Sequence, residues 1–244
     1  MLTAPMMLKA EFHAHTSDDR RDRIPHTTRE LIDRASALGY GVIAITLHDR
    51  QLDPTPHIGY ARDRGIVLIR GIERTIARRH VLLLNFPPEA ERVGTFEELA
   101  TLKQRTNGLV IAPHPFYPIP TAMGRLLDDH VDLIDAVEWN AMYTRSIDFN
   151  RHARKWAEAH GKPVVGNTDL HLLSQMGTTW TEVDAEADAD AICEAVRAGQ
   201  VRLRTEPLRT GRAAWFFTRM FLAGLPGGPK QHRGRQDVNR DDSE

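Results

Sequence analysis

Short apolar runs recur along the chain, and each ends beside side chains that bind metal ions. The runs and the residues that follow them are 8–12 before His13 and His15, 42–46 before His48, 66–72 before Glu73, 109–112 before His114, and 163–166 before Asp169 and His171. A further run, 80–84, begins with His80 and is expected to return beside the run before Glu73. Ligand-type residues at the carboxyl ends of successive strands predict one crowded site at one mouth of a parallel β-barrel.

Segments between these runs have the apolar spacing and the end signals of helices. Thr27 with Glu30, and Thr95 with Glu98, form capping boxes at two expected helix starts. We predict helices over residues 27–38, 58–64, 95–107, 121–130, 146–160, 187–198 and 212–222, and further strands near 136–140, 180–183 and 201–204. The alternation amounts to about seven βα units, so we expect an α/β fold.

Chain length and composition bound the domain organisation. The 244 residues suit one large domain, and from Gly224 onward the chain has almost nothing to bury. We therefore expect a single domain over residues 1–223 and a disordered polar tail over residues 224–244. Cys193 is the only cysteine, which excludes a disulfide within the chain and fits a reducing compartment. It is expected to be a small buried apolar residue.

Charge and hydropathy exclude some partners. The net charge is −1, so no overall charge favours nucleic acid or a membrane surface. No apolar run approaches the ~18 residues that a membrane span requires, and residues 1–7 lack the pattern of a signal peptide. We expect a cytoplasmic protein with no membrane partner. The sequence gives no indication of the oligomeric state.

The candidate ligands have the geometry of a metal cluster. Residues i and i+2 of a strand point to the same face, so His13 and His15 should aim at one point. Asp169 and His171 should do the same if strand geometry continues that far. With Glu73, His48, His80 and His114, the site would offer eight nitrogen and oxygen ligands, too many for one tetrahedral zinc ion. We expect two or three divalent ions (Zn²⁺, Mn²⁺ or Fe²⁺) that share a carboxylate.

These residues resemble the PHP family (polymerase and histidinol phosphatase). The motifs are Phe12-His13-Ala14-His15-Thr16, Thr46-Leu47-His48-Asp49, Gly71-Ile72-Glu73 followed by His80-Val81-Leu82, His114-Pro115, and Asp169-Leu170-His171. They occur in the family's order from about Leu8 to Thr179, which is most of the chain. The resemblance implies a distorted (β/α)7 TIM-like barrel with a trinuclear metal site.

The resemblance also implies a role for each ligand. His13, His15, Glu73 and Asp169 would hold one ion. Glu73 would bridge to a second ion, held also by His80 and His114. His48 and His171 would hold the third, with an acid from the loop after the first motif. That acid is expected to be Asp19, with Asp18 and Asp22 as rivals, because the usual Ser-Asp-Gly reads Ser17-Asp18-Asp19-Arg20 here.

The predicted activity is hydrolysis of a small phosphomonoester, of the histidinol-phosphate or nucleotide kind. Bound ions lower the pKa of water toward ~7 and clamp the oxygens of a phosphoryl group. We assign catalysis to Glu73, Asp169 and His171 around a metal-bound hydroxide. Substrate binding is assigned to Asn140, Arg145, Arg50 and Arg74, since arginine grips a phosphate through two hydrogen bonds.

Three alternatives remain open at this point. A nucleic-acid phosphoesterase, such as a 5′–3′ exonuclease, would use the basic and aromatic residues within 202–216, although a terminal helix docked on the barrel explains that stretch more simply. A TatD-type or amidohydrolase-type metallohydrolase also begins with His-x-His, but the amidohydrolase type needs a bridging lysine, and Lys103 and Lys162 lie away from strand ends. A catalytically inactive scaffold is the third.

Overall fold

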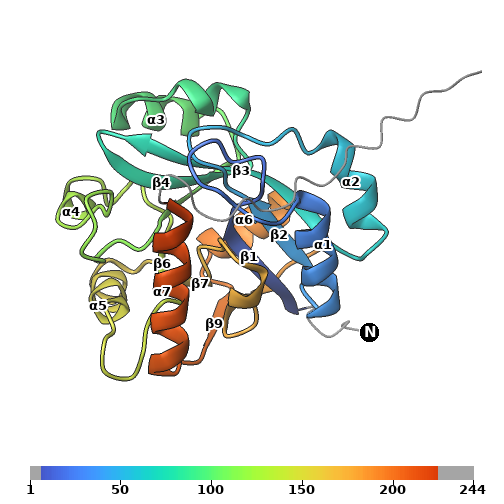
Figure 1. The fold of residues 1–244 in the computed structure, drawn as a ribbon. Helices are drawn as coiled ribbons and strands as arrows, with labels where there is room; N and C mark the ends of the chain where they lie inside the picture. Colours follow the sequence, from blue (N-terminus) through green and yellow to red (C-terminus); the bar gives the residue numbers. More distant parts are fainter. Residues whose placement is uncertain (1–6, 225–244) are drawn as a thin grey trace, which may run out of the picture.

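The computed structural model describes residues 7–224, which form one α/β domain around a nearly closed barrel sheet (Figure 1). The strands are β1 (Met7–Ala14), β2 (Val42–Ile45), β3 (Val67–Ile76), β4 (Arg79–Leu84), β5 (Leu109–Ala112), β6 (Ala136–Asn140), β7 (Val164–Asn167), β8 (Thr179–Asp184) and β9 (Val201–Thr205). The helices are α1 (Thr28–Ala37), α2 (Thr55–Arg62), α3 (Phe96–Lys103), α4 (Leu126–Asp129), α5 (Asn150–His160), α6 (Ala189–Arg197) and α7 (Thr210–Gly224), with 3₁₀ turns η1 (Pro88–Arg92) and η2 (Leu173–Gln175). The predicted α/β barrel fold is confirmed.

The strands form one sheet in the order β7-β6-β5-β4-β3-β2-β1-β8-β9. Strands β1, β2 and β3 run parallel to one another, and so do β5, β6 and β7. Strand β4 returns antiparallel between β3 and β5, as its position after β3 predicted. The turn before β4, Ala77-Arg78, has φ angles of 47° and 66°, which suits a two-residue hairpin and leaves no room for a crossover helix.

The expectation of a parallel barrel is wrong for β8 and β9, which run antiparallel to their neighbours. Strand β7 ends at the mouth of the barrel, and residues 168–178 contain only the short turn η2. A parallel crossover needs about a dozen residues or more, usually with a helix. The chain therefore stays at the mouth after β7, and β8 starts there and runs back down beside β1.

The barrel closes between β7 and the opposite edge of the sheet. Near the mouth, Leu170 exchanges backbone hydrogen bonds of 3.0 Å with His13 and His15. Farther down, the Thr181 hydroxyl accepts a hydrogen bond of 2.9 Å from the Gly166 N–H and donates one of 3.0 Å to its carbonyl. A threonine side chain thus takes the place of a regular strand ladder at this seam.

Alternate side chains along a strand face either the barrel interior or the layer beneath the helices. In β2, Val42 and Ala44 face the interior, whereas Ile43 and Ile45 pack under α1 and α2. In β5, the odd-numbered residues face the interior and the even-numbered residues pack toward α3, α4 and α5. Helix α6 adds Ile192, Cys193, Ala195 and Val196 to the interior cluster. The predicted burial of Cys193 is thereby confirmed.

Several predicted helix boundaries shift. The helix predicted over 146–160 begins at Asn150, because the Thr144 hydroxyl accepts hydrogen bonds from the backbone N–H groups of Ser146 and Ile147 and holds a turn there. Of residues 121–130, only α4 is helical. The helix predicted over 58–64 spans Thr55–Arg62 instead.

Helix α7 docks on the loops after β6 and β7. Phe216 is buried and packs with Leu208 and Ala213 against Met142 and Leu172. This is the docked terminal helix that the sequence favoured over a stacking surface for bases. Residues 225–244 lie outside the described residues, so the predicted domain end and disordered tail stay predictions. No helix among residues 7–224 is long and apolar enough to cross a bilayer.

Replacement of Gly166 by alanine should weaken the barrel seam. An added Cβ would lie 2.5 Å from Leu203 Cδ1 and 2.8 Å from the Trp180 carbonyl oxygen. We expect the free energy of unfolding in urea to fall by about 1–3 kcal/mol. Gly59→Ala in α2 is the matched control, because a Cβ there meets no atom within 4 Å. Equal stability of the two variants would contradict the proposed close contact.

Candidate metal centre

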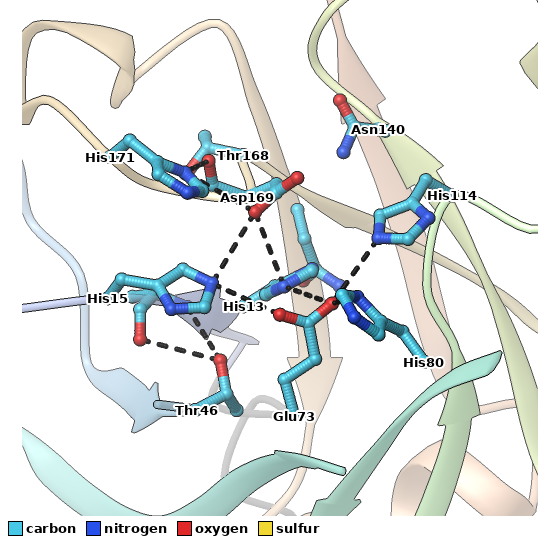
Figure 2. Close-up of polar contacts among 12 residues, drawn as sticks. His13, His15, Thr46, Glu73, His80, His114, Asn140, Thr168, Asp169 and His171 are labelled. Carbon is cyan, nitrogen blue, oxygen red and sulfur yellow. Dashed lines mark hydrogen bonds and ion pairs between the residues drawn. The ribbon is translucent and has the colours of Figure 1, made fainter. Parts of the chain in front are cut away.

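The predicted ligands from the strand ends gather at one mouth of the barrel (Figure 2). His13 and His15 come from the end of β1, and His114 directly follows β5. Glu73 comes from β3 and His80 from the start of β4, which the antiparallel hairpin brings to the same edge. Asp169 and His171 follow β7, and His48 follows β2 and forms a bridge to Glu73.

Glu73 lies at the centre of this group and is 1% exposed. Its Oε1 is 2.6 Å from His80 Nδ1, 3.3 Å from His114 Nε2 and 3.5 Å from His13 Nε2. Its Oε2 is 3.0 Å from His48 Nε2 and 3.5 Å from His15 Nε2. One carboxylate therefore faces five imidazoles, which suits a carboxylate that bridges ions.

Asp169 approaches the same point from the loop after β7. Its Oδ1 is 3.4 Å from His13 Nε2 and 3.5 Å from both His15 Nε2 and His171 Nδ1. The condition that strand geometry continues to Asp169 is not met, because β7 ends at Asn167 and Asp169 has a φ of 52°. The left-handed turn, rather than strand alternation, brings Asp169 and His171 together.

His13 and His15 each leave one ring nitrogen without a partner. The Nε2 atoms of both residues are buried and make no hydrogen bond. Each lies 3.4–3.5 Å from oxygens of Glu73 and Asp169. Ligand atoms that are each about 2.0–2.2 Å from a tetrahedral ion are separated by about 3.3–3.6 Å. These four residues therefore fit a divalent cation, which would also satisfy both orphaned nitrogens.

Second partners orient these two imidazoles. His13 Nδ1 lies 2.8 Å from Glu138 Oε2, and His15 Nδ1 lies 3.0 Å from Asp19 Oδ2. Because a carboxylate only accepts, each neutral ring carries its proton on Nδ1 and has its free electron pair on Nε2. Glu138 has no predicted role in the motifs; the signal that could have found it is an acidic residue inside the apolar run 136–140. Glu11, also buried, has the same signal in run 8–12 and accepts from Thr168.

The mouth also offers further ligand groups. The sets His48–Glu73–His80, His15–Asp19–His48 and His15–Asp169–His171 each bring three candidate atoms within 4.8 Å of one another. A fourth set of this kind is His13–His15–Glu73. Because the four sets share His15, His48 and Glu73, the arrangement suits a cluster of divalent ions better than one isolated ion. None of the four sets contains a thiolate, which favours a metal that accepts nitrogen and oxygen.

The three candidate acids of the first loop have different surroundings. Asp18 Oδ2 accepts from the Thr16 and Thr28 hydroxyls and lies with the start of α1. Asp19 is buried; its Oδ1 accepts from two backbone N–H groups of its loop, and its Oδ2 contacts His15 and His48. Asp22 has a side chain 43% exposed, and its Oδ2 lies 2.9 Å from His171 Nε2 and 3.8 Å from His48 Nδ1.

The candidate substrate-binding side chains differ in exposure and in the hydrogen bonds that they already make within the protein. Arg74 donates to the Val93 carbonyl at 2.6 Å and to Asp49 Oδ1 at 2.8 Å, so much of its guanidinium is occupied. Asn140 is buried and donates from Nδ2 to Glu138 Oε1 at 2.8 Å. Arg145 is exposed and Arg50 is partly exposed. Lys103 bonds to Asp135 and does not supply the lysine of an amidohydrolase-type site.

The acids of the metal-free cluster are held ionised. Burial alone would raise the pKa of Glu73, but the charge of His13 and hydrogen bonds from His114 and other histidines hold it well below its usual range. Burial opposes ionisation of Asp169 as well, but the charges of His13 and His171 outweigh this effect and lower the pKa.

The pKa values of two histidines, His48 and His171, shift in the opposite direction. Burial would lower the pKa of His171, but the charge of Asp169 and the hydrogen bond to Asp22 raise it to about 9. Burial opposes protonation of His48 too, and its hydrogen bonds to Asp19 and Glu73 raise the pKa to about 10. In the metal-free protein, protons thus balance the carboxylates, and metal ions compete with these protons.

Comparisons with known proteins agree with this architecture. A family model described as PHP-associated matches residues 148–201. DNA polymerase III PolC-type from Streptococcus thermophilus is 41% identical over 75 residues, which are 30% of this chain and 5% of the polymerase. The match therefore spans only a small part of that relative's length.

Two solved structures share the fold. A two-domain protein from Bacteroides vulgatus, containing a predicted PHP-like metal-dependent phosphoesterase, is 18% identical, with a TM-score of 0.63 over 88% of this chain and 70% of that chain. The lesion-specific endonuclease Q from Pyrococcus furiosus is 17% identical, with a TM-score of 0.55 over 81% of this chain and 58% of that chain. The family-model match over residues 148–201 and the shared fold support the resemblance that the motifs predicted.

The metal-free protein should lose stability as the pH rises from 7 to 9. His48 and His171 have pKa values near ~6.5 in an unfolded chain and about 10 and about 9 in the fold. Their stabilisation is complete below the unfolded value and is lost as the pH rises through the folded values. We expect the free energy of unfolding with chelator present to be lower at pH 9 than at pH 7, on the order of 4 kcal/mol, with about half from each histidine.

His171→Asn is the matched variant for this measurement. It should show a shallower pH dependence, because one of the two raised groups is gone. Protein loaded with Zn²⁺ should vary little over the same range. Rising stability of the metal-free wild type between pH 7 and pH 9 would contradict the assigned proton balance.

Proposed function

We propose that this PHP-family chain is a metal-dependent phosphoesterase that hydrolyses a small phosphomonoester, of the histidinol-phosphate or nucleotide kind. The observation that carries the proposal is the convergence of the buried, unpartnered Nε2 atoms of His13 and His15 on Glu73 and Asp169. Such a set of nitrogen and oxygen ligands suits Zn²⁺, Mn²⁺ or Fe²⁺.

Two or three ions would share these ligands. His13, His15, Glu73 and Asp169 would hold the first. Glu73 would bridge to a second held with His80 and His114, whose Nε2 lies 3.3 Å from Glu73. His48 and His171 would hold a third. For its acid we now propose Asp22 in place of Asp19, because Asp22 is less enclosed and lies beside His171, whereas both Asp19 oxygens are already engaged.

The exposure of the ligands indicates the side from which substrate arrives. The side chains of His13 and His15 are fully buried, whereas those of His171 and Asp169 are 15% and 22% exposed. Ions bound here would lower the pKa of a coordinated water and stabilise charge on the phosphoryl oxygens. Glu73 would hold the ions in place, and Asp169, on the open side, would handle the proton of the attacking water and of the leaving alcohol, while His171 would act as a ligand.

A small substrate fits the surroundings better than a nucleic acid. Arg145 is exposed in the loop after β6 and would grip a phosphate, with Arg50 and Asn140 as further candidates. Phe216 of α7, which a stacking surface for bases would use, is buried against Met142 and Leu172. Cleavage of nucleic acid is the second candidate, because endonuclease Q shares the fold.

We also keep the prediction of a cytoplasmic protein, which rests on the single buried cysteine.

Glu73→Gln should reduce hydrolysis of p-nitrophenyl phosphate in the presence of Mn²⁺ by at least about 100-fold, because the variant loses the charge that bridges the ions. His152→Gln, at an exposed histidine of α5, is the control and should retain wild-type activity. A wild-type protein that holds metal but turns over no phosphoester would count against the proposal.

The same assay separates the two substrate classes. Single-stranded oligonucleotides should compete weakly with the small substrate, and turnover should depend little on salt. Strong competition that disappears with added salt would favour the nucleic-acid alternative, because salt screens phosphate contacts.

Asp22→Asn should weaken binding of the last Zn²⁺ ion by at least about tenfold, because an amide replaces a charged ligand. Asp18→Asn is the matched control, since Asp18 bonds to threonine hydroxyls and should leave every ion in place. Zn²⁺ titration against a competing chelator measures both. Loss of the last ion in Asp18→Asn, with none in Asp22→Asn, would overturn the assignment.

A further inference from the structure

Glu138 is a buried carboxylate beneath the metal centre. It lies on β6 and is fully buried. Its Oε2 lies 2.8 Å from His13 Nδ1 and accepts from Asn167 Nδ2 at 3.1 Å. Its Oε1 accepts from the His114 backbone N–H at 3.2 Å and from Asn140 Nδ2 at 2.8 Å. Four donors from four different segments therefore end on one side chain.

The Oε2 contact determines which nitrogen of His13 can bind a metal. A neutral imidazole carries one N–H, and a carboxylate neighbour draws it to the facing nitrogen. With the proton on Nδ1, the free electron pair lies on Nε2. That atom is buried, makes no hydrogen bond, and faces Glu73 Oε1 at 3.5 Å and Asp169 Oδ1 at 3.4 Å.

Glu138 Oε1 restrains the backbone of His114, which is a second candidate ligand. His114 has a φ of 32°, in the region that residues other than glycine rarely adopt. Such a conformation persists only where the surroundings hold it. The hydrogen bond from the His114 N–H to Glu138 is one such restraint, and His114 Nε2 then lies 3.3 Å from Glu73 Oε1.

We propose that Glu138 is the positioning residue of the metal centre. It fixes the tautomer of His13 with one oxygen and the backbone of His114 with the other, so that ligands from β1 and from the turn after β5 present their Nε2 atoms together. This inference rests on the proposed metal function of the mouth. Glu138 binds neither the ions nor the substrate, and its effect passes through the two histidines.

Glutamine has the same shape but cannot replace this carboxylate. Its amide offers one accepting oxygen and an NH₂ group that only donates, whereas all four neighbours of Glu138 are donors. With the oxygen turned toward His114 and Asn140, the NH₂ group would face His13 Nδ1 and favour the proton on Nε2. That tautomer has no electron pair for a metal.

The test compares Glu138→Gln with Glu11→Gln by competition between the protein and a chelator for Zn²⁺. Both substitutions replace a buried carboxyl group, but Glu11 bonds to the backbone of His13 and to Thr168, with no hydrogen bond to an imidazole among the described residues. We expect Glu138→Gln to weaken Zn²⁺ binding by about 10- to 100-fold and Glu11→Gln to weaken it clearly less. Equal losses in both variants, or wild-type affinity in Glu138→Gln, would overturn the proposal.

If Glu138→Gln does not fold, a spectroscopic measurement on the wild type still tests the proposal. In the Zn²⁺-loaded wild type, His13 should show a slowly exchanging, low-field Nδ1–H proton resonance, assigned by its loss in His13→Gln. If that resonance is absent, or if His13 carries its proton on Nε2, the proposal fails. A wild type that binds no Zn²⁺ would instead count against the metal function itself, so the two failures are distinguishable.

Discussion

One buried carboxylate surrounded by imidazoles constrains the whole mouth of this barrel. Glu73 has almost no contact with water, so its negative charge must be balanced from nearby. Five histidines face its two oxygens. In the metal-free protein, protons on His13, His48 and His114, whose pKa values are raised, contribute balancing charge, and divalent ions would supply it more fully. With or without metal ions, these side chains stay together because an unbalanced buried charge would cost free energy.

The rest of the fold serves to bring those side chains to one edge. Parallel strands deliver His13, His15, His48 and His114 because their carboxyl ends meet at the same rim. The β3–β4 hairpin delivers Glu73 and His80 from opposite chain directions. Helix α6 packs into the interior cluster, so the barrel interior is filled with apolar residues rather than open. The mouth is the place where polar residues remain buried.

A second layer of carboxylates gives the cluster its order. Glu138 holds His13, and Asp19 holds His15 and His48. Glu11 holds the backbone next to Asp169 through Thr168. Two candidate ligands, His114 and Asp169, also have backbone conformations in the left-handed region. Strain of this kind is concentrated where the geometry of side chains matters more than the local preference of the chain.

By itself, the sequence determined the α/β class, the strands that end in ligand-type residues, and the membership of the cluster, because apolar period and local end signals are properties of neighbouring residues. It did not determine the antiparallel course of β8 and β9, or the turn that presents Asp169, because these depend on how the chain closes the barrel. Nor did it distinguish Asp18, Asp19 and Asp22, or give Glu138 a role. Only the tertiary structure shows the surroundings of these acids, because a carboxylate can acquire its partners from segments more than a hundred residues away, as Glu138 does from His13.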